Sequence, residues 1–351
     1  MRKIISVILV GVIALLSLSS CKNEEFKKFS EYYFDFFDTA TTITGYEKTK
    51  EDFDKVCSDI KAQLYEYHKL YDIYKRYDGI NNLYVVNSLH NGEHKETVVD
   101  QKIIELLEFS KEVHEKTSGK VNVAMGSVLS IWHDYRSEGE NDPSRARLPE
   151  MSELQEASLH TSIDSIVIDK ENKTVFISDP KSTLDVGAVA KGYVAEKIAE
   201  HLRNQGKIGY VINLGGNVCS VGGRHDGSPW AVGIENPDTE NEDKPYIAYL
   251  HISGESVVTS GVYQRYYYVG GKRYHHIIDP DTLMPAENFM SVSIICKNSA
   301  MGDAYSTALF SMNYEDGLAL IEADPDAEAL WVLNSGEVKF SSGFSRYTYE
   351  P

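Results

Sequence analysis

The order of strand-like and helix-like segments constrains this chain more than any other feature of its sequence. Residues 37–46 (FDTATTITGY) are rich in β-branched side chains and predict a strand, whereas residues 48–70 place apolar side chains at helical spacing. Strands and helices stay intermixed to the end of the chain, without a regular strand–helix–strand rhythm. This order favours an α+β fold built on a mixed sheet over a doubly wound parallel sheet. The chain also lacks GxGxxG and a P-loop motif, so neither type of nucleotide site is supported.

The remaining elements follow from the same patterns. A hairpin is expected at 165–178 with Glu171 and Asn172 at its turn, and a second hairpin turns at Gly270 and Gly271. No internal repeat and no long linker separates these segments into domains. Further helices are expected at 100–116, 152–158, 188–204, 300–312 and 314–323, and further strands near 208–214, 230–235, 246–252, 264–269, 273–278, 291–296 and within 329–341.

The N-terminal residues have the pattern of an exported bacterial lipoprotein. Met1-Arg2-Lys3 precedes an apolar run that is shorter than the roughly 20 residues of a spanning helix, and Leu18-Ser19-Ser20-Cys21 has the form of a lipobox. The pattern predicts a cleaved signal peptide at 1–20, lipidation of Cys21, a polar tether at 21–30 and a folded domain at 31–351. We therefore expect the protein at the cell membrane, lipid-anchored on the extracytoplasmic face.

Charge narrows the ligands that this chain is expected to bind. With 53 acidic and 35 basic side chains the net charge is −18, which offers no cationic surface for nucleic acid. A polyanionic ligand would need a metal ion or a local group of cations. Cys57, Cys219 and Cys296 lie in apolar runs without metal-binding spacing and are expected to be buried free thiols.

Two glycine-containing clusters stand at predicted helix starts. In LDVGAVAKGY (184–193), the free N–H groups of a helix start and the ammonium of Lys191 suit a phosphate, although Asp185 as a helix cap beside a solvated lysine fits equally well. In GDAYSTA, Asp303 and Thr307 are four residues apart and share a helix face, where their oxygens suit Mg²⁺. The alternative is that Asp303 only complements the helix dipole.

Two further clusters lie at strand ends. TSGVYQR (259–265) and YHHIIDP (274–280) flank the second expected hairpin, which brings their polar side chains near each other. An adjacent His and Asp suit general acid and base catalysis, and an exposed surface pair would have the same sequence. NLGGN (213–217) follows an apolar strand, where a tight turn and a ligand contact explain the glycines equally well.

Together and in this order, LDVGAVAKGY, INLGGN, TSGVYQR, HHIIDP and GDAYSTALF resemble the motifs of the FAD:protein FMN transferases, the ApbE-type flavin transferase family. The resemblance runs from about Phe37 to Met312. It implies a T-fold-like α+β architecture with a mixed sheet, one FAD site, and Mg²⁺ shared between the protein and the pyrophosphate.

The resemblance also implies roles for individual residues. His276 matches the family's histidine before an Ile-Asp-Pro turn and is the candidate catalytic base. The metal would be held by the backbone carbonyl of Ala188 together with Asp303 and Thr307. FAD contacts would fall at Phe37, Tyr74, Lys120, Val121, Asn122, Asp185, Lys191 and Ile277.

The chain departs from the family pattern at two places. Many members read GAFDPTVG where this chain has GKVNVAMG (119–126), so Val121 replaces an aromatic residue and Asn122 replaces an aspartate. Many also have Gly-Thr where Asp38-Thr39 stands here. Backbone contacts to a flavin would survive both changes, whereas the side-chain roles at these positions do not follow from the family.

The implied reaction is a metal-assisted phosphoryl transfer. A threonine hydroxyl of a partner protein attacks the FMN-side phosphorus of FAD, AMP leaves, and Mg²⁺ is the cofactor. The family's acceptors carry a Ser/Thr-Gly-Ala-Ser/Thr type motif, which Thr259-Ser260-Gly261-Val262 does not match, so the chain is expected to modify other proteins. Two alternatives stay open: a Mg²⁺-dependent FAD pyrophosphatase that yields FMN and AMP, and a non-catalytic flavin-binding lipoprotein.

Overall fold

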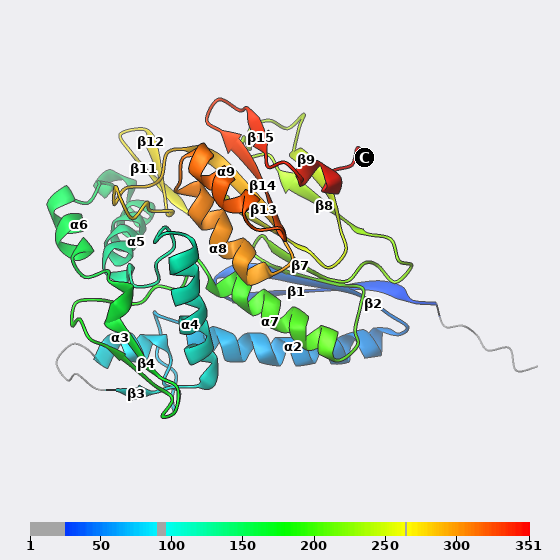
Figure 1. Ribbon diagram of the computed structural model, residues 1–351, viewed down its shortest axis with the longest axis horizontal. Helices are drawn as coiled ribbons and strands as arrows, with labels where there is room; N and C mark the ends of the chain where they lie inside the picture. The colour runs from blue at the N-terminus through cyan, green and yellow to red at the C-terminus, as the bar shows by residue number, and fades with distance from the viewer. Residues whose placement is uncertain (1–24, 90–95, 264) are drawn as a thin grey trace, which may run out of the picture.

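The computed structural model describes residues 25–89, 96–263 and 265–351 (Figure 1). The predicted signal peptide and the lipidation site Cys21 lie outside these residues. Among the residues that are described, no helix combines the length and the apolar character needed to cross a bilayer.

An eight-stranded sheet forms the centre of the fold. Its neighbouring strands are all antiparallel. The predicted α+β class is confirmed. The sheet was expected to mix parallel and antiparallel pairs, whereas every pair in it is antiparallel. The reason is that tight turns join neighbouring strands such as β1 (Lys27–Phe36) and β2 (Thr39–Glu47), and a tight turn reverses the chain direction. In spatial order the strands are β1 (Lys27–Phe36), β2 (Thr39–Glu47), β6 (Tyr210–Leu214), β7 (Asn217–Val221), β10 (Ser256–Gly261), β13 (Phe289–Cys296), β14 (Ala327–Leu333) and β15 (Val338–Phe340).

Three helices cover one face of the sheet (Figure 1). They are α2 (Lys50–Tyr71), α7 (Ala190–Asn204) and α8 (Ser299–Phe310). Their apolar side chains, such as Phe53, Ile198 and Phe310, meet those of the strands in the main core. Two further helices pack around this layer, α4 (Gln101–Lys116) against α2 and α9 (Tyr314–Glu322) against β14.

A smaller β-ribbon covers part of the opposite face. It consists of β8 (Trp230–Glu235) and β9 (Tyr246–Ile252). Trp230 and Leu250 of the ribbon share a second core with Val257, Ile295 and Leu330 of the sheet. The ribbon therefore lies chiefly over β10, β13 and β14.

A third group of elements stands at one end of the sheet (Figure 1). Trp132, Leu154 and Tyr267 pack together there, so helices α5 and α6 and the hairpin of β11 and β12 form one unit. The group comprises α3 (Leu83–Leu89), α5 (Gly126–Asn141), α6 (Met151–Ser158), β3 (Thr97–Val98), β5 (Thr174–Ile177), β4 (Ile166–Asp169), β11 (Tyr266–Val269) and β12 (Lys272–His275). Elsewhere in the fold and within this group, short 3₁₀ helices occur at Pro143–Arg145, Ile163–Ser165 and Phe344–Tyr347.

Most of the predicted elements are confirmed within a few residues. The helix expected at 48–70 is α2, the hairpin at 165–178 is β4 with β5, and the second hairpin is β11 with β12. Cys57, Cys219 and Cys296 are buried free thiols, as expected. The sequence patterns do not predict α3, α5, β1, β3, β7 or β10.

The start of the folded domain differs from the prediction. The strand expected at 37–46 begins at Thr39, because Phe37 and Asp38 form a turn with φ angles of 53° and 50°. Residues 27–30, assigned above to the polar tether, belong to β1 and pair with β2. Backbone pairing outweighs the polar character of Lys27 and Lys28, since an edge strand tolerates charged side chains.

Helices α7 and α8 pack closely at Gly192. A Cβ atom at this position would overlap the Cβ atom of Asp303 and the carbonyl oxygen of Ser299. The backbone N–H of Gly192 donates a hydrogen bond to Oδ2 of Asp303 at 2.8 Å. The missing side chain at 192 therefore sets both the separation of the two helices and the position of the Asp303 carboxylate.

We expect Gly192→Ala to destabilise the fold by roughly 1–3 kcal/mol, because extra atoms in a close-packed contact force the backbone to shift. Gly317→Ala in α9 is the matched control, since its Cβ atom would meet the Leu309 side chain at 3.4 Å, an ordinary contact. Thermal unfolding of both variants measures the difference. A melting temperature for Gly192→Ala equal to that of the unsubstituted chain would contradict the tight contact.

Candidate active site

One cavity of about 680 Å³ is lined by residues from α5, α7, α8 and the end of β10. Its volume is in the range of small-molecule sites. The structure brings to this one place all of the site residues named from the sequence except the lipidation site. They are Phe37, Tyr74, Lys120, Val121, Asn122, Asp185, Ala188, Lys191, His276, Ile277, Asp303 and Thr307.

Oxygen atoms gather at the end of the cavity formed by α7 and α8. The side chain of Asp303 is only 5% exposed, and its burial raises the pKa of the carboxyl group. Thr307 lines the cavity one helical turn further along α8. Asn217, at the start of β7, also lines the cavity, and its buried Oδ1 atom has no hydrogen-bond partner.

These oxygens fit a hard divalent cation. Mg²⁺ prefers carboxylate, hydroxyl and carbonyl oxygens and takes few of them from the protein. A bound cation would offset the cost of burying the Asp303 carboxylate and would give the Asn217 oxygen a partner. Among the described residues no three His, Cys, Asp or Glu side chains form a metal-binding group, which is consistent with a site that has a single acidic ligand.

The structure also decides between the alternatives for two acidic residues. Helix α8 is capped by Asn298, which accepts the backbone N–H of Met301 at 3.1 Å, and Asp303 lies beyond its first turn. The residue that caps α7 is Val189, and Asp185 instead accepts the N–H of Gly187 at 2.8 Å within the preceding loop. Neither aspartate is therefore the plain helix cap, and both line the cavity.

Cations surround His276 inside this acidic chain. The side chains of Arg136, Lys191 and Arg265 all line the cavity with it. Burial and then the positive charges of Arg265, Arg136 and Lys191 lower the pKa of His276 to about 3. The imidazole is therefore neutral at physiological pH, and the three cations form the local positive charge that the composition requires for an anionic ligand.

Aromatic side chains form another wall of the cavity. Tyr74 lies with its ring centroid 5.3 Å from that of His133, and burial raises the pKa of Tyr74 to about 12. The backbone N–H of Phe37 donates to Nδ1 of His68 at 3.3 Å. The Phe37 ring meets the His68 ring edge-on at 5.6 Å. Such faces suit the stacking of a planar heterocycle.

Lys120 lines the cavity, where the resemblance implies an FAD contact, and its charge is also paired within the protein. Its ammonium contacts Oδ1 of Asp279 at 2.8 Å and Oδ2 of Asp281 at 2.7 Å. These contacts join the loop at 119–126 to the turn that follows His276. Lys120 therefore also positions these two segments of the cavity wall.

Asn122, which replaces the family's aspartate, is engaged by the protein itself. Its Nδ2 donates to the carbonyl of Thr161 at 2.8 Å, and its Oδ1 accepts the N–H of Ala124 at 2.9 Å. An aspartate would keep the second bond and lose the first, because a carboxylate has no hydrogen to donate. Asn122 therefore stabilises this wall of the cavity.

The sequence analysis gives no site role to several side chains that line the cavity, among them Arg265, Asn217, His133 and Arg136. Arg265 ends the TSGVYQR motif and Asn217 ends NLGGN, so both lay within recognised clusters. His133 and Arg136 belong to α5, a helix that was not predicted, and no motif marks them.

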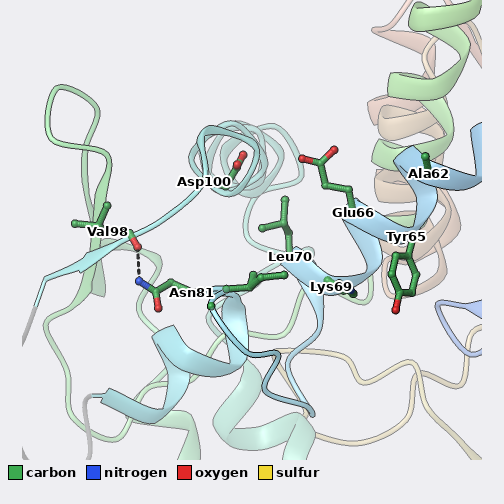
Figure 2. A pocket seen from close by; sticks show the side chains of 10 residues that line it. Ala62, Tyr65, Glu66, Lys69, Leu70, Asn81, Val98 and Asp100 are labelled. Atoms are coloured by element: carbon green, nitrogen blue, oxygen red, sulfur yellow. Dashed lines mark hydrogen bonds between the residues drawn. The ribbon is translucent and has the colours of Figure 1, made fainter. Parts of the chain in front are cut away.

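A second cavity of about 510 Å³ lies beside the C-terminal half of α2 (Figure 2). Tyr65, Glu66 and Leu70 line it from α2, and the side-chain amide of Asn81 donates to the carbonyl of Val98 at 2.8 Å across it. None of the residues named for the active site lines this cavity.

The main cavity of this α+β fold suits an anionic ligand with a planar ring. A buried corner of oxygen ligands, a group of cations and aromatic walls lie within one cavity. Residues 37–331 match the model of the ApbE family. The chain belongs to this family.

Characterised relatives agree with this assignment. An FAD:protein FMN transferase from Klebsiella pneumoniae (strain 342) is 29% identical over 296 residues, which cover 81% of this chain and 89% of that protein. The FAD:protein FMN transferase of Treponema pallidum (strain Nichols) is 33% identical, covering 70% of this chain and 69% of that protein.

Solved structures support the same fold. The crystal structure of the ApbE protein from Thermotoga maritima superposes with a TM-score of 0.78 at 25% identity, covering 93% of this chain and all of that one. The flavin transferase ApbE from Vibrio cholerae superposes with a TM-score of 0.75 at 22% identity, covering 92% of this chain and 100% of that one, a similarity of fold.

We expect Lys120→Met to destabilise the protein by about 1–3 kcal/mol, because Asp279, which is largely buried, would lose its charged partner. Lys120→Arg should restore most of the loss. The control is Lys272→Met in β12, which removes an exposed ion pair with Glu287 and should have little effect. Denaturant unfolding of the three variants makes the comparison, and equal midpoints for the two methionine variants would contradict the positioning role.

Proposed function

We propose that this chain is an FAD:protein FMN transferase that moves the FMN part of FAD to a threonine hydroxyl of an acceptor protein and releases AMP. The observation that carries the proposal is the single cavity in which an oxygen-ligand corner at Asp303 and Thr307 adjoins the cations around His276. The names of the curated relatives support the same reaction.

We propose Mg²⁺ as the cofactor of this reaction. Asp303, Thr307 and the backbone carbonyl of Ala188 would hold it, and the buried Asn217 oxygen, which has no hydrogen-bond partner and belongs to the same cavity lining, would be a further ligand. The metal would neutralise negative charge on the pyrophosphate of FAD.

The remaining roles fall to the chain's own side chains. Lys191, Arg136 and Arg265 would bind the phosphate oxygens, since each brings a positive charge to the cavity. The oxygen of the threonine hydroxyl would attack the FMN-side phosphorus, and the bond from that phosphorus to AMP would break. His276 would accept the proton that the hydroxyl loses. The negative charge of bound FAD would offset the three cations and raise the pKa of His276, which makes the imidazole a stronger base when substrate is present.

An FAD pyrophosphatase is the second candidate. Water would replace the threonine hydroxyl in the same cavity, and the products would be FMN and AMP. A non-catalytic flavin-binding protein is less consistent with the site, because burying Asp303 at the cavity wall costs free energy that mere flavin binding does not require.

One incubation separates the three functions. The full chain in detergent is mixed with FAD, Mg²⁺ and a soluble acceptor domain that carries a Ser/Thr-Gly-Ala-Ser/Thr type motif. Covalent yellow fluorescence on a denaturing gel identifies the transferase. Free FMN without labelled acceptor identifies the pyrophosphatase, and unchanged FAD identifies a binding protein.

The place of action is also a proposal, and it rests on the sequence. The lipobox at Leu18-Ser19-Ser20-Cys21 supports a lipid anchor that holds the domain on the extracytoplasmic face of the cell membrane. Mass spectrometry of the mature N-terminus tests it, with Cys21→Ser as the variant that cannot be lipidated.

We expect Asp303→Asn to abolish Mg²⁺-dependent turnover while the protein stays folded. Asparagine keeps an oxygen for the N–H of Gly192 but removes the only full negative charge among the proposed ligands. Calorimetric titration of Mg²⁺ into the FAD-loaded protein, together with transfer assays, measures both effects. Asp316→Asn, an exposed acidic residue in the first turn of α9, is the control. Normal Mg²⁺ binding by Asp303→Asn would refute the proposed metal ligand.

His276→Ala is expected to lower kcat for transfer by roughly 10²-fold or more, while FAD affinity changes little, because a base acts mainly in the transition state. FAD fluorescence titration and single-turnover transfer at saturating FAD separate the two effects. Weak binding combined with a normal saturated rate would show that the histidine only contacts the flavin. Asp279 is a poor substitute as a base, since Lys120 already binds it.

A further inference from the structure

Strand β1 forms one edge of the eight-stranded sheet. Among the described strands, only β2 pairs with it. Alternate backbone N–H and C=O groups of an antiparallel edge strand point away from its neighbour and are available to another chain. Figure 1 shows this strand (blue) with α2 packed on one of its faces.

The side chains of β1 divide between the two faces of the sheet. Phe29 and Tyr33 pack against the main core on the helix side. Tyr32 alternates with them and stands on the other face, where it is 63% exposed. Phe34 lies in the irregular stretch between Tyr33 and Phe36, where the pairing with β2 shifts register, and is 75% exposed. Two large exposed aromatic side chains two residues apart on an open strand form an unusual apolar surface for so acidic a chain.

The β8–β9 ribbon does not reach these two aromatics. It meets this side of the sheet at Tyr46, whose ring lies 5.6 Å from that of Trp230. Tyr46 pairs with Lys28, near the start of β1, whereas Tyr32 pairs further along with Thr42. Tyr32 and Phe34 are therefore left uncovered within the described structure.

The same strand leads directly into the active-site cavity. β1 ends at Phe36, and the next three residues, Phe37, Asp38 and Thr39, line the cavity. The turn between β6 and β7 contributes Gly215 to the same rim. The free edge and its exposed aromatics thus continue into the place where an acceptor hydroxyl would have to enter.

We propose that β1 is the docking strand for the acceptor protein. An extended segment of the acceptor beside its target threonine pairs with the free edge of β1, and apolar side chains of that segment contact Tyr32 and Phe34. This inference rests on the proposed transferase function. Backbone pairing provides affinity that depends little on sequence, and aromatic contacts provide the anchor points.

A membrane surface is the competing occupant of the two aromatics. The order of residues along β1 favours a protein, because Lys27 and Lys28 stand at the end nearer the proposed anchor at Cys21, and the aromatics stand at the cavity end. A lipid surface would be met first by the lysine end of the strand.

The test compares transfer kinetics of the full chain in detergent solution. The double variant Tyr32→Ser with Phe34→Ser changes only exposed side chains and should leave the fold intact. Phe340→Ser is the matched control, an exposed phenylalanine on β15 at the opposite edge of the same sheet. We expect KM for the soluble acceptor domain to rise about 10-fold or more in the double variant only. FAD affinity and the rate at saturating acceptor should change by no more than about twofold.

Amide hydrogen exchange gives a second readout that does not depend on catalysis. Addition of the acceptor domain should slow exchange in residues 27–36 and should leave β15 unchanged. If the unsubstituted chain transfers no flavin, the proposed function fails while the exchange data still test docking. An unchanged KM in the double variant, an equal rise in Phe340→Ser, or unchanged exchange in β1 would overturn the proposal. Loss of binding to phosphatidylglycerol vesicles with an unchanged KM would assign the aromatics to the membrane instead.

Discussion

The contact between Gly192 and Asp303 is the constraint on which the active site depends. It fixes α7 against α8 at one point, and the hydrogen bond from the Gly192 N–H orients the carboxylate. A second contact between the two helices lies one turn further along α7, where the Glu196 carboxylate accepts a hydrogen bond from the backbone N–H of Ser299 at 2.6 Å. Because α7 carries Lys191 and α8 carries Thr307, these two contacts bring a cation and the oxygens proposed as metal ligands to the same corner. The main core beneath them holds this arrangement rigid.

The positively charged side chains that line the cavity fall into two groups: one is paired with carboxylates of the protein, and the other is available to a ligand. Lys120 is bound by Asp279 and Asp281 and joins two walls of the cavity. In the described part of the chain, neither Lys191 nor Arg265 forms an ion pair, so their charges are available to a ligand. A chain with a net charge of −18 attracts an anionic substrate only through such a local group. Burial lowers the pKa of His276, and the positive charges of Arg265, Arg136 and Lys191 lower it further.

The sequence predicts the residues of this site better than it predicts the structure around them. The motifs at 184–193 and 274–280 lie at element ends, where turn chemistry is local, and the motif at 302–308 lies within α8; side chains of all three line the cavity. The pairing of Lys120 with Asp279 is not predictable, since it joins positions far apart in the chain. Strand β1 is missed because KKFSEYYFDF lacks a clean alternation of polar and apolar residues; its place is set by pairing with β2. Helix α5 carries few buried side chains, so its apolar pattern is weak.

The choice between transfer and hydrolysis rests on what occupies the mouth of the cavity. Metal ligands, cations and His276 serve a threonine hydroxyl and a water molecule equally well, so none of them discriminates between the two nucleophiles. Phe37, Asp38 and Thr39 form part of the rim and follow directly on β1. An acceptor segment paired with β1 would lie over this rim, bring its hydroxyl to the phosphorus at high effective concentration and exclude water. Selectivity for the acceptor would then come from the edge of the sheet, and the chemistry from the cavity beside it.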